Sequence, residues 1–142
     1  MKKPNNDIKL KIRFLIVGAW NTLFGYGVFY LLDYAFEGLF EARYAAYMSA
    51  ICIAQVIAVI NAFIFHKYYT FRSKVKSIKI VGEFLKFSLT YAAVFCLNII
   101  LMPVFVEIFH VQPRLSGLVI LFINTLVSYV GHSRFSFKHS ST

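Results

Sequence analysis

The chain alternates between long apolar stretches and short polar connections. Four stretches carry almost no charge, and they run over Arg13–Leu32, Ala45–Phe65, Phe87–Phe109 and Leu115–Phe135. Each is close to the roughly 20 residues that a helix needs to cross the hydrocarbon core of a bilayer. The pattern therefore predicts an all-α fold, an integral membrane bundle with transmembrane helices over residues 13–32, 45–65, 87–109 and 115–135.

Composition agrees with a membrane protein. Hydrophobic residues make up 59% of the 142 positions and charged residues only 15%, which is too little polar surface for a soluble domain. Residues 1–142 are thus predicted to form a single transmembrane domain. The net charge of +9 would suggest nucleic acid in a soluble protein, but here the basic residues gather at the ends of the spans, so no nucleic-acid partner is expected.

The charges are distributed unequally between the two sides of the predicted bundle. All basic residues except Arg43 and Arg114 lie in the N-terminal residues 1–12, at Arg13, in the connection 66–86, or at and beyond the end of the last span. Basic residues mark the cytoplasmic side of a membrane protein. Both termini and the basic loop 66–86 are therefore expected in the cytoplasm.

The two halves of the chain resemble each other. Lys11-Ile12-Arg13-Phe14 leads into the first span as Phe84-Leu85-Lys86-Phe87 leads into the third, and an asparagine follows within each, Asn21 or Asn98. Each half runs across the membrane and back, so the halves would be two parallel hairpin repeats. Convergence is the alternative, because cytoplasmic helix ends generally favour basic and aromatic residues.

Small residues recur at every fourth position along the second span. Such a row lets two helix backbones approach closely, and the first span offers a partner face at Gly18, Thr22 and Gly25. We expect the first two spans to pack together, with a homodimer seam through the second span as the alternative. The row consists of Ala46, Ala50, Ala54, Ala58 and Ala62.

Amide side chains occur in all four spans. A polar group in hydrocarbon needs a partner or a wet cavity, so these amides predict either a polar pathway or interhelical hydrogen bonds. No carboxylate or lysine lies near the middle of a span, which argues against a proton-coupled exporter of the four-helix multidrug type. The amides are Asn21, Gln55, Asn61, Asn98 and Asn124.

Catalytic chemistry has no visible basis in the chain. There is no nucleophile–base pair, metal cluster or phosphate-binding glycine loop, so we expect no enzyme activity, metal or cofactor. Cys52 and Cys96 lie in different spans without the spacing of a metal site, and we expect packed thiols.

The basic connection before the third span has an amphipathic pattern. Val75, Ile78, Val81 and Leu85 recur at helical spacing with lysines among them. Basic amphipathic helices bind the surface of anionic bilayers. The pattern predicts a short interfacial helix between the second and third spans, with a plain connector as the alternative.

A family resemblance covers nearly the whole chain. Arg13-Phe14, Val17-Gly18 and Asn21, followed by Asn61, Phe63, Lys67 and Phe71, resemble the GtrA-like family. The resemblance implies a small multi-pass protein of the bacterial inner membrane that acts in cell-surface polysaccharide synthesis or O-antigen modification. It implies translocation of a polyprenyl-phosphate-linked sugar such as undecaprenyl-phosphate glucose, or an accessory role for the glycosyltransferase that makes this lipid.

Such a lipid has a phosphate, a polar sugar and a long apolar chain. Cations at the cytoplasmic helix ends suit the phosphate, although each also fits a role in topology; they are Arg13, Lys67, Lys86 and Arg134. The five amides would then line the path of the sugar. The partners expected are the lipid, a membrane glycosyltransferase and a second copy of the chain.

Overall fold

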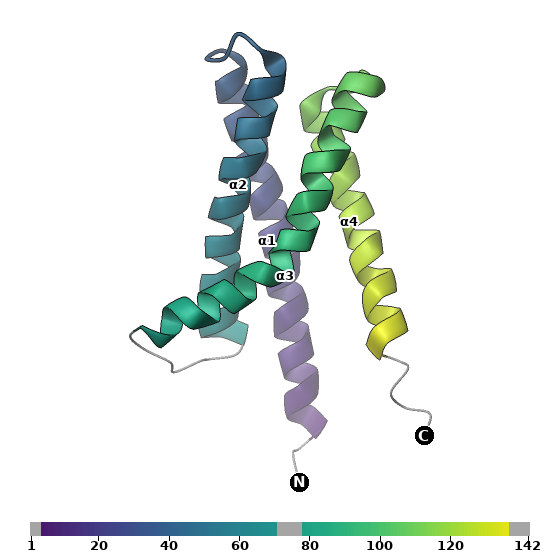
Figure 1. The fold of residues 1–142 in the computed structure, drawn as a ribbon. Coiled ribbons are helices and arrows are strands. Elements are labelled where there is room, and N and C mark those ends of the chain that lie inside the picture. The colour runs from purple at the N-terminus through teal and green to yellow at the C-terminus, as the bar shows by residue number, and fades with distance from the viewer. Residues whose placement is uncertain (1–3, 71–77, 137–142) are drawn as a thin grey trace.

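The computed structural model describes residues 4–70 and 78–136, with side chains for residues 8–70, 78–89 and 91–126. These residues form helices and short connections, without a strand among them (Figure 1). In chain order the elements are α1 (Pro4–Glu37), α2 (Arg43–Phe65), the π-helical turn η1 (His66–Thr70), α3 (Lys79–Pro103), the π-helical turn η2 (Val104–Ile108) and α4 (Pro113–Ser136).

The helices pair as two hairpins. The connections at residues 38–42 and 109–112 lie at the same end of the molecule, at the top of Figure 1. We call this end, with residues 33–43 and 107–114, the turn end. The opposite end, with residues 8–14, 66–70 and 79–87, is the basic end.

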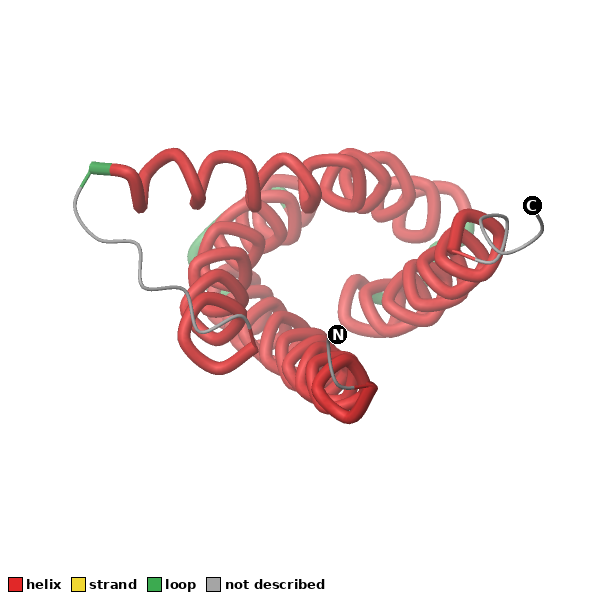
Figure 2. Tube along the Cα trace, turned by 90° about the horizontal axis from the view of Figure 1, so that it is seen from below, coloured by secondary structure: helices red, strands yellow, loops and turns green. Residues whose placement is uncertain are grey.

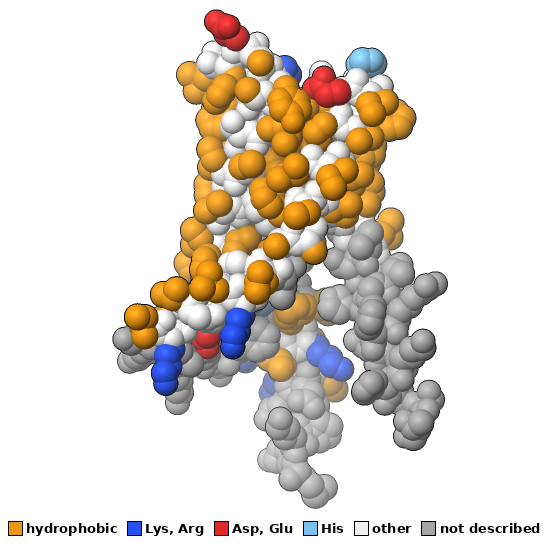
Figure 3. Space-filling model, in the orientation of Figure 1, with side chains coloured by type: hydrophobic (Ala, Val, Ile, Leu, Met, Phe, Trp, Pro, Cys, Tyr) orange, Lys and Arg blue, Asp and Glu red, His pale blue; other side chains and the backbone are white. Residues whose placement is uncertain are grey.

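The surface between the two ends is apolar. Hydrophobic side chains form a continuous band there, and charged side chains appear above and below it (Figure 3). Three segments are long and apolar enough to cross a membrane, Ile8–Glu37, Arg43–Thr70 and Tyr91–Ile108. Within an apolar stretch of 18 residues in each, only 6% to 28% of the residues are buried inside the protein. Apolar helices exposed to this degree need lipid as their surroundings, so the chain is a membrane protein. The described apolar part of α4, Pro113–Leu126, is shorter, and a fourth span over 115–135 stays a prediction.

The basic connection differs from the loop expected over residues 66–86. The helical backbone continues past Phe65 into η1, where no glycine or proline stops it, and α3 already begins at Lys79. The first turns of α3 run sideways from the bundle (Figure 2). The described part of the expected interfacial helix is thus the start of α3 rather than a separate element, and residues 74–77 lie outside the described part of the chain.

Prolines shape the connection between α3 and α4. Pro103 lacks the N–H that would continue the α-helical ladder, and the chain passes there into η2, which closes with the N–H of Phe109 donating to the carbonyl of Val104 at 3.2 Å. Pro113 is the first residue of α4, a position where the missing donor costs nothing.

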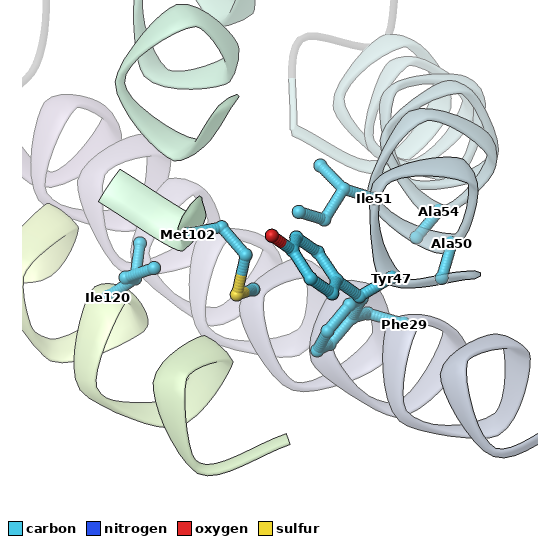
Figure 4. Packing of buried hydrophobic residues seen from close by; sticks show 7 residues of the cluster. All are labelled: Phe29, Tyr47, Ala50, Ile51, Ala54, Met102 and Ile120. Carbon is cyan, nitrogen blue, oxygen red and sulfur yellow. The ribbon is translucent and has the colours of Figure 1, made fainter. Parts of the chain in front are cut away.

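A buried hydrophobic cluster joins all four helices near the turn end. Tyr47 of α2 is completely buried, and Phe29 of α1, Met102 of α3 and Ile120 of α4 belong to the same cluster (Figure 4). On α4, Gly117 faces Phe29 so closely that an added Cβ would lie 2.7 Å from the phenyl Cε1. This packing brings the two hairpins together.

The alanine row of α2 faces the interior. Ala46, Ala50, Ala54 and Ala62 are buried, and α1 lies close to the row at Gly25, where an added Cβ would be 3.3 Å from the Cβ of Ala58. Gly18 differs from the expectation, because a Cβ added there would meet nothing within 4 Å. Near Gly18 the buried residues of α1 are Val17 and Asn21, and of the two glycines only Gly25 lies close to α2.

Candidate functional site

At the basic end, Arg13 of α1 lies against η1. Its guanidinium carbon is 5.6 Å from the centre of the Tyr69 ring, within the range of a cation–π interaction. Arg13 is half-buried. The cation is therefore held on the protein at the end of the apolar band.

An apolar groove begins beside this pair. It has a volume of about 230 Å³ and is lined by Ile16, Val17, Trp20, Phe65 and Tyr69. Tyr69 belongs both to the groove and to the cation–π pair with Arg13. Four of the five lining side chains are also exposed at the protein surface, so the groove opens toward the surroundings of the bundle.

The second predicted cation, Lys67, is buried and paired. Its side chain is 3% exposed, and Nζ lies 2.5 Å from Oε2 of Glu83 on α3. The ammonium group also lies 5.9 Å from the centre of the Phe63 ring. An anion would have to displace the carboxylate of Glu83 to reach Lys67. Sequence reasoning missed this ion pair because it placed Glu83 in a loop.

His66 precedes Lys67 and ties three elements together. Its ring lies between Phe14 of α1 and Phe87 of α3, with centroid distances of 5.1 and 5.7 Å. Nδ1 is 3.2 Å from Oγ1 of Thr70, within hydrogen-bond distance. The turn η1 thus presents His66, Lys67 and Thr70 to the interior, where all three are buried.

The remaining two predicted cations do not join this cluster in the described structure. Lys86 is exposed on α3, and the side chain of Arg134 lies outside the described residues. Of the four cations expected to bind phosphate, the structure therefore places two at η1: Lys67 belongs to this turn, and Arg13 lies against it. Of these two, only Lys67 forms a salt bridge with a described carboxylate.

Four of the five predicted amides form pairs within the hairpins. In the first, Nδ2 of Asn61 donates to Oδ1 of Asn21 at 3.3 Å, and in the second, Nδ2 of Asn124 donates to Oδ1 of Asn98 at 2.7 Å. Oδ1 of Asn124 is buried and accepts no hydrogen bond from a described residue. Gln55 is half-buried on α2, outside both pairs. Each hairpin thus carries one amide pair.

The turn end contains an ion network that sequence reasoning did not single out. Asp33 of α1 is fully buried and accepts two hydrogen bonds of 2.7 Å from Arg43 of α2. Arg114 of α4 donates to the same carboxylate from Nε at 3.1 Å. Glu37, one turn beyond Asp33, pairs with both arginines. Three helices are therefore joined through one pair of carboxylates.

Aromatic side chains surround this network. The guanidinium of Arg114 lies 5.5 Å from the ring centre of Tyr30 and 5.3 Å from that of Tyr34. The hydroxyl of Tyr26 donates to the backbone carbonyl of Arg114 at 2.9 Å. Nearby, the hydroxyl of Tyr47 donates to Glu107 at 2.9 Å.

A sequence signal for this network exists. Arg43 and Arg114 are the two basic residues of an otherwise acidic side, and Asp33 and Glu37 stand four positions apart on α1, which places them on one helix face. Two cations in an apolar setting require two anions. The crossing of α1, α2 and α4 that joins them is a tertiary feature.

Neither cysteine takes part in these clusters. Packed thiols were expected, but Cys52 and Cys96 are free thiols on exposed faces of their helices. They are exposed because both positions face away from the neighbouring helices. Among the residues with described side chains, no group of three histidine, cysteine or acidic residues could hold a metal ion.

Comparison with known proteins places the chain in a family. The sequence model of the family described as "GtrA/DPMS, transmembrane domain" matches residues 13–137. No curated protein and no solved structure matches the chain. The match includes Arg13, both amide pairs and the whole turn-end network. Since it covers most of the sequence, the chain belongs to the GtrA/DPMS transmembrane domain family.

Proposed function

We propose that this protein carries a polyprenyl-phosphate-linked sugar, such as undecaprenyl-phosphate glucose, across the bacterial inner membrane for the modification of a cell-surface polysaccharide. Proteins of the family handle polyprenol-linked sugar phosphates and are generally non-catalytic. Following the positive-inside rule, the basic end faces the cytoplasm, where the lipid is loaded.

The observation that carries this proposal is the position of Arg13 beside the apolar groove. A polyprenyl phosphate combines an anion with a long apolar chain. The site offers the guanidinium of Arg13 against the ring of Tyr69, which lines the groove together with Ile16 and Trp20. A guanidinium matches the geometry of phosphate oxygens. The site therefore suits the two chemically different parts of the lipid at once.

The amide pairs support the transfer of the sugar. Asn21 lies two helical turns beyond Arg13 on α1, and its Oδ1 accepts a hydrogen bond from Nδ2 of Asn61. Each side-chain amide has more donors and acceptors than one hydrogen bond uses, and Oδ1 of Asn124 is left without a described partner. These groups can exchange their mutual hydrogen bonds for bonds to sugar hydroxyls.

A second candidate function is recruitment of the glycosyltransferase that makes the lipid. It is favoured by the start of α3, where Val81 and Leu85 are 56% and 60% exposed and Ile78, directly before the helix, is 83% exposed. The basic Lys79 and Lys86 lie next to these residues. An apolar face with flanking cations suits a membrane-bound partner or the bilayer surface. A homodimer would enlarge the space available to a sugar and is part of the transport proposal.

Transport of a fluorescent polyprenyl-phosphate-glucose analogue in proteoliposomes tests the proposal. A membrane-impermeant quencher reports the fraction of lipid that changes leaflet in the presence of wild type, Arg13→Ala and Asn21→Ala. Lys9→Ala is the matched control, because Lys9 is an exposed cation one turn before Arg13. We expect transport by wild type and Lys9→Ala and loss in the other two variants.

Absence of transport by correctly inserted wild type would contradict this function. Co-purification with the glycosyltransferase that is lost on Val81→Asp but survives Asn21→Ala would then support the recruitment function instead.

A further inference from the structure

The two carboxylates of the turn-end network differ in exposure. The side chain of Asp33 is 0% exposed, whereas that of Glu37 is 50% exposed. The two arginines that bridge them, Arg43 and Arg114, keep 32% and 23% of their side chains exposed. Asp33 is thus a fixed internal anion, and Glu37 occupies the open side of the arginine pair.

We infer that Arg43 and Arg114 form a second anion site, in which a lipid phosphodiester replaces the carboxylate of Glu37. The inference rests on the proposed function for its ligand, since a sugar linked through one phosphate to a polyprenol is such a phosphodiester. It carries a single negative charge, as Glu37 does. The exchange leaves the charge of the network unchanged and leaves the ion pairs of Asp33 in place.

Guanidinium geometry suits this exchange. Nη1 and Nη2 of Arg43 donate to Asp33, and its Nε lies 3.7 Å from Glu37. Nε of Arg114 donates to Asp33, and its Nη2 donates to Glu37. One nitrogen of each arginine therefore lies toward Glu37, and these two donors can each serve one oxygen of a phosphodiester.

The ring faces beside the site suit the rest of the lipid. Tyr30 and Tyr34 lie under Arg114 and are 43% and 67% exposed. Aromatic faces exposed at the end of an apolar band fit the boundary between hydrocarbon and water. The basic end has the same combination, Arg13 on Tyr69.

One exposed side of α1 connects the two arginine–tyrosine pairs. After Arg13, the side chains of Ile16, Trp20, Leu23 and Tyr30 follow at intervals of three to seven residues, and all four are at least 43% exposed. At 1.5 Å per residue, Arg13 and Tyr30 are about 26 Å apart along the helix, close to the thickness of the hydrocarbon core. The apolar chain of a lipid can stay in the bilayer along this side while its phosphate moves from one arginine site to the other.

Binding measurements with the full-length protein test the second site. The protein is placed in phosphatidylcholine nanodiscs, and Arg13→Gln is introduced as background so that the basic end does not contribute. The probe is a fluorescent short-chain prenyl-phosphate-glucose. Glu37→Gln removes the competing carboxylate and should tighten binding by up to about fivefold, the range of an exposed ion pair. Glu41→Gln is the matched control, because it removes an exposed acid near Glu37 that forms no salt bridge with a described residue.

The outcomes separate the second site from the proposed function. Tighter binding of the probe by Glu37→Gln alone supports the site. An equal increase in affinity in Glu37→Gln and Glu41→Gln overturns it, because the increase then follows from the loss of any negative charge at the turn end. Transport by wild type together with unchanged binding in Glu37→Gln overturns the site and leaves the proposed function standing. If Glu37→Gln alone binds the probe more tightly but wild type does not transport the lipid, the result supports the site and contradicts the proposed function. Competition by phosphatidylglycerol as strong as that by unlabelled probe identifies an ordinary phospholipid headgroup as the source of the phosphodiester.

Discussion

Arg43 holds the buried carboxylate of Asp33 through two parallel hydrogen bonds of 2.7 Å. The pair joins the end of α1 to the start of α2 across the connection 38–42, and Arg114 adds α4 to it. A carboxylate that is 0% exposed would be very costly without these partners. The network therefore determines how the turn end is assembled.

Replacement of Asp33 by alanine is expected to destabilise the bundle strongly. The substitution leaves two partly buried guanidinium groups without their main partner, and breaking a buried pair in this way typically costs about 3–5 kcal/mol. Unfolding of the purified protein in mixed micelles measures the effect. Glu41→Gln at the same end should unfold as wild type does, and equal stability of Asp33→Ala and wild type would contradict the structural role.

Replacement of Arg13 by alanine is expected to weaken binding of a polyprenyl-phosphate analogue. Hydrogen bonds to charged groups contribute about 1.5–3 kcal/mol, which corresponds to a loss of about tenfold or more in affinity. Arg13→Lys should recover part of the affinity, because it keeps the charge and loses the flat fork that lies on Tyr69. Titration of the analogue into nanodiscs checks both variants. Equal weakening by Lys9→Ala would show that overall charge, and not the position of Arg13, controls binding.

Sequence patterns predicted the membrane class, the helical fold and the arrangement of charge, because these follow from hydropathy along one chain. Interhelical hydrogen bonds were one of the two alternatives for the amides, without named partners, and the structure pairs Asn21 with Asn61. The ion pair of Lys67 with Glu83 was not predicted, since it depends on η1 and on an α3 that begins before its apolar part. These are tertiary features, and no glycine or proline marks either boundary.

The packing of Gly18 is another tertiary feature that the sequence pattern did not predict. Its spacing with Thr22 and Gly25 suggested one continuous face, yet only Gly25 meets α2 closely. A row of small residues shows that close approach is permitted along its length. It does not show at which level two straight helices cross.

The amide pair of the second hairpin should affect transport more than stability. Hydrogen bonds between membrane helices contribute only about 0.6 kcal/mol on average, so Asn98→Ala is expected to lower the free energy of unfolding by a comparably small amount. Loss of its acceptor also removes a polar group from the proposed path of the sugar, and the transport rate should fall at least about tenfold, a change of about 1.4 kcal/mol in the barrier. Cys96→Ala, an exposed position on the same helix, is the control for both measurements. An intact transport rate in Asn98→Ala would remove this pair from the path.

Two glycines of α1 provide a matched test of how the first hairpin packs. Gly25→Leu is expected to destabilise the protein by about 1–3 kcal/mol, the usual cost of overpacking, because even a Cβ at this position would lie 3.3 Å from the Cβ of Ala58. Gly18→Leu adds the same side chain to the same helix where a Cβ meets nothing within 4 Å, and its stability should be close to that of wild type. Unfolding of both variants in the same micelles gives the comparison directly. If Gly18→Leu were the more destabilised of the two, α1 and α2 would have to cross nearer to the basic end than this structure places them.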